Sequence, residues 1–230
     1  MGEIYCLSQN ELKALITGTG ADYVVGLSVD KSRLTACQTV RALNHLMAED
    51  LISNQGDSFE MTEDIRTIVT AVTGERYISL HSNRLELPAK VLYPGQKIVT
   101  CILSGYENAG LCFELHSHDT LRDDMQAEGY LPEDDSMIPL KELNLINDEL
   151  DDFEQSQAAY ECDKPLPATS RILLRADCVN SCGYILSSLR ILDYGIYRYI
   201  LFVSEDKKCR EPYSGAAVKN RFEEMLSCDS

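Results

Sequence analysis

The segment CFELHSH carries the clearest metal-binding chemistry of this chain. Strand alternation would place Cys112, Glu114, His116 and His118 on one face of the segment, with the apolar residues on the other. A His-x-His pair on a strand can hold zinc or copper, and Cys112 or His81 could add a ligand. A polar strand face that leads into a loop has the same pattern. Because the spacing places no third ligand securely, we assign no metal site.

Nine cysteines offer a second kind of chemistry. They are Cys6, Cys37, Cys101, Cys112, Cys162, Cys178, Cys182, Cys209 and Cys228. Because their number is odd and the chain is larger than small disulfide-stapled scaffolds, we interpret them as reduced thiols, mostly in the core. Cys178 and Cys182 form C-x3-C, which differs from the C-x2-C of zinc knuckles and redox pairs. No local signature orients a cysteine nucleophile toward a histidine, so we assign no catalytic residue.

A glycine pair, Gly18-x-Gly20, is the only segment that suggests a nucleotide fingerprint. It follows a predicted helix rather than a strand, and it lacks the third glycine and the downstream acid of such a fingerprint. We interpret it as the end of a helix and assign no cofactor-binding residue. The sequence therefore predicts a protein without a cofactor that is not an enzyme.

Acidic residues are concentrated between Asp119 and Asp163. This segment holds fifteen acidic residues against two basic ones, Arg122 and Lys141, which gives a net charge of −13 out of −16 for the chain. A like-charged block of this kind is solvated and repels nucleic acid and anionic membranes. The charge pattern therefore predicts protein or small-molecule partners and no nucleic acid.

The length and apolar content predict a folded core. The chain has 230 residues, of which 44% are apolar. No stretch approaches the roughly 18 apolar residues that a membrane span needs, and the start MGEIYCLSQNELKAL lacks a signal-peptide pattern. We expect no membrane insertion and a cytoplasmic location.

Residues 1–75 are predicted to form a helical, winged-helix-like subdomain. Ser8 and Glu11 form a capping box for the first helix, and a second helix is expected from Ser32 to about Glu49. Two short strands about a turn at 54–57 and a helix opened by Thr62 follow. The subdomain carries five basic residues against eleven acidic ones, which favours packing or protein contact over DNA binding.

Residues 76–230 are predicted to form a mainly antiparallel sheet with flanking helices. Short strands rich in Ile, Val, Leu, Tyr and Phe alternate with turn signals at Pro94-Gly95, 107–110 and 193–195. Each block of strands is followed by a helix, at 119–129 and at 215–226, which indicates a weak duplication of two halves. The predicted fold class is α+β.

A long acidic helix is predicted between the two blocks, over 138–160. A narrow apolar seam runs along this helix and consists of Leu143, Ile146, Leu150, Phe153 and Tyr160. The seam can pack on the protein's own sheet or dock a partner helix. We favour packing on the sheet, with the acidic faces on the rim of a groove elsewhere.

The closing segment resembles a known family. The order runs from an LSQNELKAL helix through AKVLYPGQKIVTCILSG, HDTLRDDM and the acidic helix to RILLRADC, LDYGIYRYILF and REPYSGAAVKNRFEEML. The part from Asp193 to Tyr199, with its apolar strand, polar turn and terminal helix, is similar to the closing unit of the cytosolic chaperones of type VII (ESX) secretion. The winged-helix-like start and the many cysteines depart from the mycobacterial members, which implies a distant relative from another bacterial group.

This resemblance implies a cytoplasmic protein that binds small helical-hairpin secretion substrates before export. Such a chaperone needs no catalytic residue, because an apolar stripe of the client would lie against a groove whose rim charges set partner choice. The alternative is an acidic winged-helix regulator with a ligand-sensing second domain, and an enzyme is the third possibility. The sequence makes no prediction about homo-oligomers.

Overall fold

The computed structural model describes residues 4–21, 23–29, 32–56, 58–103, 110–133, 135, 139–159 and 169–227. The chain divides into two compact units. Unit 1 consists of Met1–Leu80, Pro88–Leu121 and Val179–Tyr184, and unit 2 consists of His81–Leu87, Arg122–Cys178 and Ile185–Ser230. Residues 1–75 thus lie in unit 1 together with later strands, and a domain boundary at residue 75 remains a prediction.

Five strands lie side by side in unit 1, in the order β1, β7, β6, β5, β4, and each neighbouring pair is antiparallel. These strands are β1 (Ile4–Leu7), β4 (Arg76–Ser82), β5 (Lys90–Tyr93), β6 (Ile98–Ile102) and β7 (Leu111–His116). The predicted turn at Pro94-Gly95 joins β5 to β6, whereas residues 107–109 of the next predicted turn lie outside the described residues. The sequence did not predict β1, because a four-residue strand takes its order from pairing with a distant segment.

The first part of unit 1 has the predicted order of helix, helix, hairpin and helix. The elements are α1 (Gln9–Gly18), α2 (Ala36–Ala48), β2 (Ile52–Asn54), β3 (Phe59–Met61) and α3 (Glu63–Val72). The capping box of Ser8 and Glu11 is confirmed. The start of α2 at Ser32 was wrong, because Thr35 and Gln38 form the capping box that begins this helix. The winged-helix arrangement itself remains a prediction.

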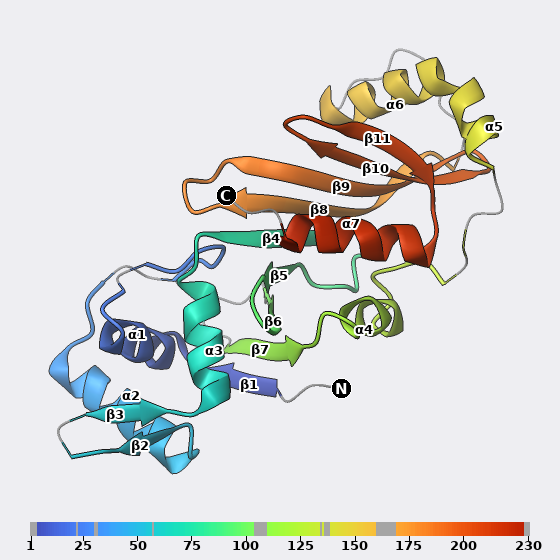
Figure 1. Ribbon diagram of the computed structural model, residues 1–230. Coiled ribbons are helices and arrows are strands. Elements are labelled where there is room, and N and C mark those ends of the chain that lie inside the picture. The colour runs from blue at the N-terminus through green and yellow to red at the C-terminus, as the bar shows by residue number, and fades with distance from the viewer. Residues whose placement is uncertain are drawn as a thin grey trace. The chain divides into compact units, whose positions relative to one another are not determined.

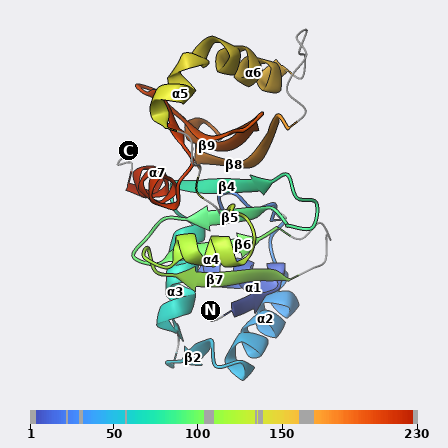
Figure 2. The ribbon, with the colours of Figure 1, turned by 90° about the vertical axis from the view of Figure 1, so that its right-hand side faces the viewer.

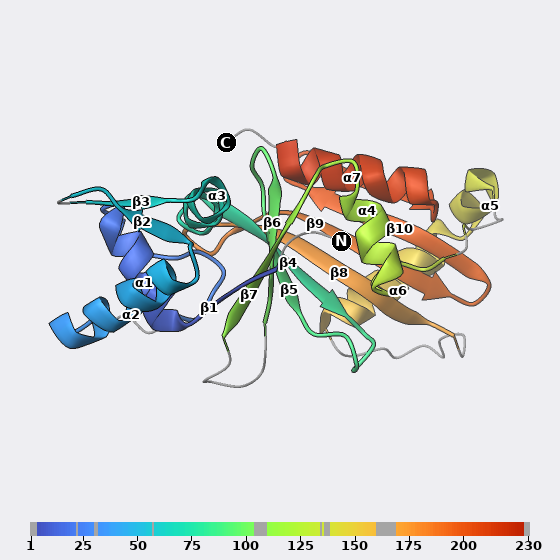
Figure 3. The ribbon, with the colours of Figure 1, turned by 90° about the horizontal axis from the view of Figure 1, so that it is seen from below.

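The helices of unit 1 cover one face of its strands, as Figure 3 shows from below. Residues from α1 and α3 are buried against apolar residues of β5, β6 and β7, and the central ones are Leu12, Ile65, Ile68, Val91, Val99 and Phe113. Asp64 of α3 accepts hydrogen bonds from the Tyr5 hydroxyl at 2.7 Å and from Lys97 Nζ at 2.8 Å. Apolar burial and these two contacts therefore hold α3 against β1 and β6.

Unit 2 contains the second block of strands and the remaining helices. The elements are α4 (Leu121–Ala127), α5 (Leu140–Leu145), α6 (Asn147–Ala159), β8 (Arg171–Asn180), β9 (Ile185–Tyr194), β10 (Tyr197–Ser204), β11 (Lys208–Pro212) and α7 (Gly215–Ser227). β9, β10 and β11 pair antiparallel, and Gly195 makes the predicted turn between β9 and β10 with a φ of 62°. The α+β class and the mainly antiparallel strands are confirmed.

Strand β10 is covered on both faces within unit 2. Tyr199 and Leu201 pack in the cluster formed with α6, whereas Phe202, which follows Leu201, lies beneath the Arg221 guanidinium of α7, 5.3 Å from the ring centroid. Figures 1 and 2 show α6 and α7 on opposite sides of these strands. The continuous apolar run of β10 is therefore explained by burial on both faces rather than by one-sided alternation.

The acidic helix predicted over 138–160 is two helices, which corrects the single helix expected from the seam. Backbone N–H of Ile146 donates to the Leu143 carbonyl at 3.3 Å, and Ile146 leaves helical geometry with φ −112° and ψ 21°. This tighter turn separates α5 from α6. Ile138 and Tyr160 lie outside the described residues.

Candidate functional site

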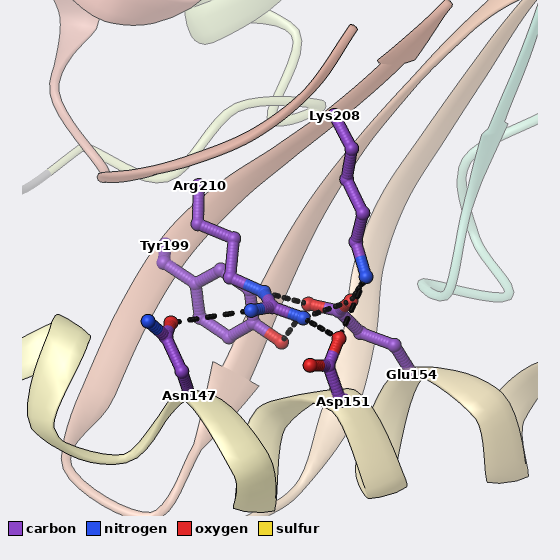
Figure 4. A network of polar contacts seen from close by, with 6 residues as sticks. All are labelled: Asn147, Asp151, Glu154, Tyr199, Lys208 and Arg210. Atoms are coloured by element: carbon purple, nitrogen blue, oxygen red, sulfur yellow. Dashed lines mark hydrogen bonds and ion pairs between the residues drawn. The ribbon is translucent and has the colours of Figure 1, made fainter.

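The inner side of α6 is fixed to β11 by a network of charged groups (Figure 4). Arg210 Nε and Nη2 each lie 2.7 Å from a different carboxylate oxygen of Glu154, so that the ion pair is bidentate. Arg210 also donates to Asp151, and its Nη1 donates to Asn147 Oδ1 at 3.2 Å. Lys208 Nζ completes the network at 2.7 Å from Asp151 and 3.0 Å from Glu154.

The network holds its groups in defined protonation states. Hydrogen bonds from Lys208 and Arg210 lower the pKa of Asp151 below its usual value of 3.8. The hydrogen bond to Glu154 raises the pKa of Arg210 above its already high value. Burial, together with the Glu154 charge, raises the pKa of Tyr199, which remains a neutral donor to Glu154 at 3.2 Å. The network is therefore suited to fixing a helix and not to proton transfer at neutral pH.

The apolar seam of the acidic segment packs inside unit 2. Leu143, Leu150 and Phe153 are each at most 1% exposed and belong to one buried cluster with Leu192 and Tyr199. Packing of the seam on the protein's own strands, which we favoured over docking of a partner helix, is therefore confirmed. The outward side of the segment is acidic, with exposed Asp148, Glu149 and Asp152.

Three consecutive large apolar residues are exposed at the start of β9. Tyr184 is 71% exposed, Ile185 55% and Leu186 37%. The turn before them is ordered, because the Asn180 side chain accepts hydrogen bonds from the backbone N–H groups of Cys182 at 3.0 Å and Tyr184 at 2.9 Å. A run of three exposed apolar residues on an ordered turn is unusual without a binding role. We name Tyr184, Ile185 and Leu186 the apolar tip.

The histidines of CFELHSH do not converge on one point. His116 is buried, with Nε2 3.1 Å from the Thr100 hydroxyl and 3.6 Å from Glu114, whereas His118 Nε2 lies 2.8 Å from the Gly95 carbonyl. His81 belongs to unit 2, whereas His116 and His118 belong to unit 1. Within the described residues, no group of three or more His, Cys, Asp or Glu side chains could hold a metal ion.

The two cysteines of the C-x3-C segment, to which we assigned no dithiol function, differ in their surroundings. Cys178 is buried near the Met225 carbonyl of α7, with a sulfur–oxygen distance of 3.9 Å, whereas Cys182 is exposed in the turn. Burial raises the pKa of Cys101 to about 12 and that of Cys112 to about 11, where the neighbouring Cys6 contributes. These two thiols are protonated at neutral pH and are poor nucleophiles.

The sequence reasoning missed the apolar tip and the ion network. The sequence analysis placed Tyr184 to Leu186 within a block of short strands and made no separate prediction for them, although three consecutive apolar residues directly after Gly183 were a usable signal. Arg210 and Glu154 are 56 residues apart, and no pattern in the sequence connects them.

No helix in the described part of the chain is long and apolar enough to cross a membrane. No model of a known protein family matches the sequence, and no curated protein matches it.

A comparison with solved structures shows a protein of similar fold. It is the type VII secretion system chaperone EspG5 of Mycobacterium tuberculosis, solved in complex with a PE25–PPE41 dimer. The TM-score is 0.55 at 10% sequence identity, and the similarity covers 97% of this chain and 96% of the EspG5 chain. The fold implied by the family resemblance is therefore confirmed.

Proposed function

We propose that this protein is a cytoplasmic, non-catalytic chaperone for small helical-hairpin substrates of type VII secretion. The fold it shares with EspG5 over nearly the full length of both chains supports this role, because EspG5 is a chaperone solved with a bound protein dimer. The protonated thiols of Cys101 and Cys112 and the dispersed histidines support a role without catalysis.

The single observation that carries the proposal on this chain is the apolar tip. Because the Asn180 side chain holds the backbone of the turn at Tyr184, little backbone conformational entropy is lost when the apolar tip contacts a partner. Aromatic and large aliphatic side chains of this kind are typical anchors of interfaces. A client helix would lay its apolar stripe across the tip, in the manner of helix recognition by apolar surfaces.

The test uses purified helical-hairpin protein pairs encoded beside the gene of this chain. We expect one such pair to form a stable complex in size-exclusion chromatography, and calorimetry gives its affinity. The double variant Tyr184→Thr/Ile185→Thr keeps strand-forming residues while it removes the apolar anchors. We expect this variant to bind the pair at least about tenfold more weakly, because a few anchors carry most of the interface energy.

Leu85→Thr is the matched control, because Leu85 is fully exposed at 101% and lies outside the tip. We expect the Leu85→Thr variant to bind the helical pair with the same affinity as the wild-type protein. If no neighbouring helical pair binds, the chaperone role is wrong. If a pair binds and the double variant binds it equally well, the role stands and the apolar tip is not the contact surface.

A further inference from the structure

Unit 2 contains a cavity of about 310 Å³ whose wall is rich in arginine. Arg84 follows β4, Arg171 begins β8 and Arg198 lies on β10, and all three line this cavity. Among the described lining residues, Glu133 is acidic, and Tyr130 and Leu173 add apolar surface to the cavity wall. A cationic cavity is unexpected in a chain whose net charge is −16.

Two of the arginines are held in place by one buried acid. Arg198 Nε lies 2.8 Å from Asp193 Oδ1, and Arg171 Nε lies 3.4 Å from Asp193 Oδ2. The Asp193 side chain is 10% exposed. Asp193 therefore positions both guanidinium groups at the cavity and balances one of their two charges.

Arg84 adds a further positive charge to the cavity wall. No other described residue pairs with its guanidinium in an ion pair or hydrogen bond. Gly129, which has a φ of +88°, faces it, and a Cβ at this position would lie 3.2 Å from Arg84 Nη1. The glycine thus leaves space beside a guanidinium group for which the described part of the chain provides no acidic partner.

We propose that this cavity binds a carboxylate attached to a small apolar group. Among the described residues, three arginines against Glu133 and Asp193 leave one net positive charge, which matches a singly charged carboxylate better than a doubly charged phosphate. Planar guanidinium groups hold carboxylates by paired hydrogen bonds. Tyr130 and Leu173 would contact the apolar part of the ligand. This site is independent of the proposed chaperone role.

The test compares N-acetyl-leucine with N-acetyl-leucinamide by calorimetry on the full chain. The two probes share an apolar body and differ in the carboxylate. We expect saturable, millimolar binding of the acid, as ligand efficiency allows for a molecule of this size, and binding of the amide weaker by at least about tenfold. Inorganic phosphate is expected to bind more weakly than the acid.

The Arg84→Gln variant removes the positive charge of Arg84 from the cavity wall and keeps a polar side chain. We expect it to bind N-acetyl-leucine at least about tenfold more weakly. Arg41→Gln, on the exposed surface of α2, makes the same change in charge outside the cavity and should leave the affinity unchanged. Equal binding of acid and amide, unchanged affinity of Arg84→Gln, tighter binding of phosphate, or no binding of any probe would overturn the proposal.

The source of the carboxylate is distinguished by a third probe, a hexapeptide that ends in leucine with a free C-terminus. If the hexapeptide binds at least as tightly as N-acetyl-leucine and its C-terminal amide does not, the site captures a peptide terminus. If N-acetyl-leucine binds and the hexapeptide does not, the site holds a free small carboxylic acid. Both results retain a carboxylate as the ligand.

Discussion

Arg210 on β11 and Glu154 on α6 form a bidentate ion pair that is almost completely removed from water. The Arg210 side chain is 11% exposed and the Glu154 side chain 5%, and both contacts measure 2.7 Å. In a setting of low dielectric constant, removal of one partner leaves an uncompensated charge whose desolvation cost is large. The pair therefore fixes the position of α6 more strongly than exposed ion pairs of the same geometry would.

The first prediction concerns this pair. Arg210→Met should lower the free energy of unfolding by about 3 kcal/mol, because Glu154 would stay buried with Lys208 as its remaining cation. The double variant Arg210→Met/Glu154→Leu should recover most of the loss, because it buries apolar groups of similar volume. Urea denaturation of both variants measures the two values.

Arg66→Met is the matched control for Arg210→Met. Its partner Glu60 lies 3.8 Å away, and the two side chains are 63% and 59% exposed. An exposed pair of this kind contributes about 0–1 kcal/mol, so this variant should be nearly as stable as the unchanged protein. Equal losses in Arg66→Met and Arg210→Met would show that burial of the Arg210 pair is unimportant.

The second prediction concerns the stability of the fold at acidic pH. Hydrogen bonds from Lys97 and Tyr5 lower the pKa of Asp64, and hydrogen bonds from Lys208 and Arg210 lower that of Asp151, below the usual 3.8. Because the folded pKa values lie below the unfolded ones, these groups stabilise the fold fully above pH 3.8, and the stabilisation is lost as pH falls through the folded values.

Denaturation series across the acidic range test this linkage. Unfolding free energy should fall below about pH 4, and Asp151→Asn should show a shallower fall than the unchanged protein. Asp148→Asn, which alters an exposed acid on the outward side of α6, is the control and should keep the original slope. Parallel acid slopes for Asp151→Asn and the unchanged protein would contradict the assigned pKa shift.

Much of the fold could be predicted from local signals. The capping box at Ser8 begins α1, the Pro94-Gly95 turn joins β5 to β6, and Gly195 turns β9 into β10. In each case the residues that set the geometry lie within a few positions of one another. Capping and turn residues therefore predict the structure correctly where it is determined by residues that are close in sequence.

The features that escaped prediction depend on distant residues. Strand β1 exists through its pairing with β7, in which Cys6 lies opposite Cys112, and the break at Ile146 interrupts a seam whose spacing indicated one helix. Arg84, Arg171 and Arg198 meet at one cavity only after the strands have paired. The periodicity and the capping signals of a sequence do not indicate which distant residues come together in the fold.

The third prediction concerns nucleic acid and separates the chaperone from the regulator. Residues 1–75 carry eleven acidic residues against five basic ones, so few phosphates could be neutralised. We expect no measurable binding of duplex DNA at physiological salt in fluorescence anisotropy. Sub-micromolar, salt-sensitive binding of a duplex would favour the winged-helix regulator instead.

The last prediction uses two leucines of the acidic segment that differ in environment. Leu150 of α6 is 0% exposed, whereas Leu145 of α5 is 77% exposed. Leu150→Asp should lower the free energy of unfolding by roughly 3 kcal/mol or more, because an unpaired carboxylate would replace apolar contacts with Leu192 and Tyr199. Leu145→Asp introduces the same charge in water and should change stability by about 0.5 kcal/mol or less. Thermal melts and urea curves of both variants give the comparison, and an unchanged melting temperature for Leu150→Asp would mean that the seam does not stabilise the free protein.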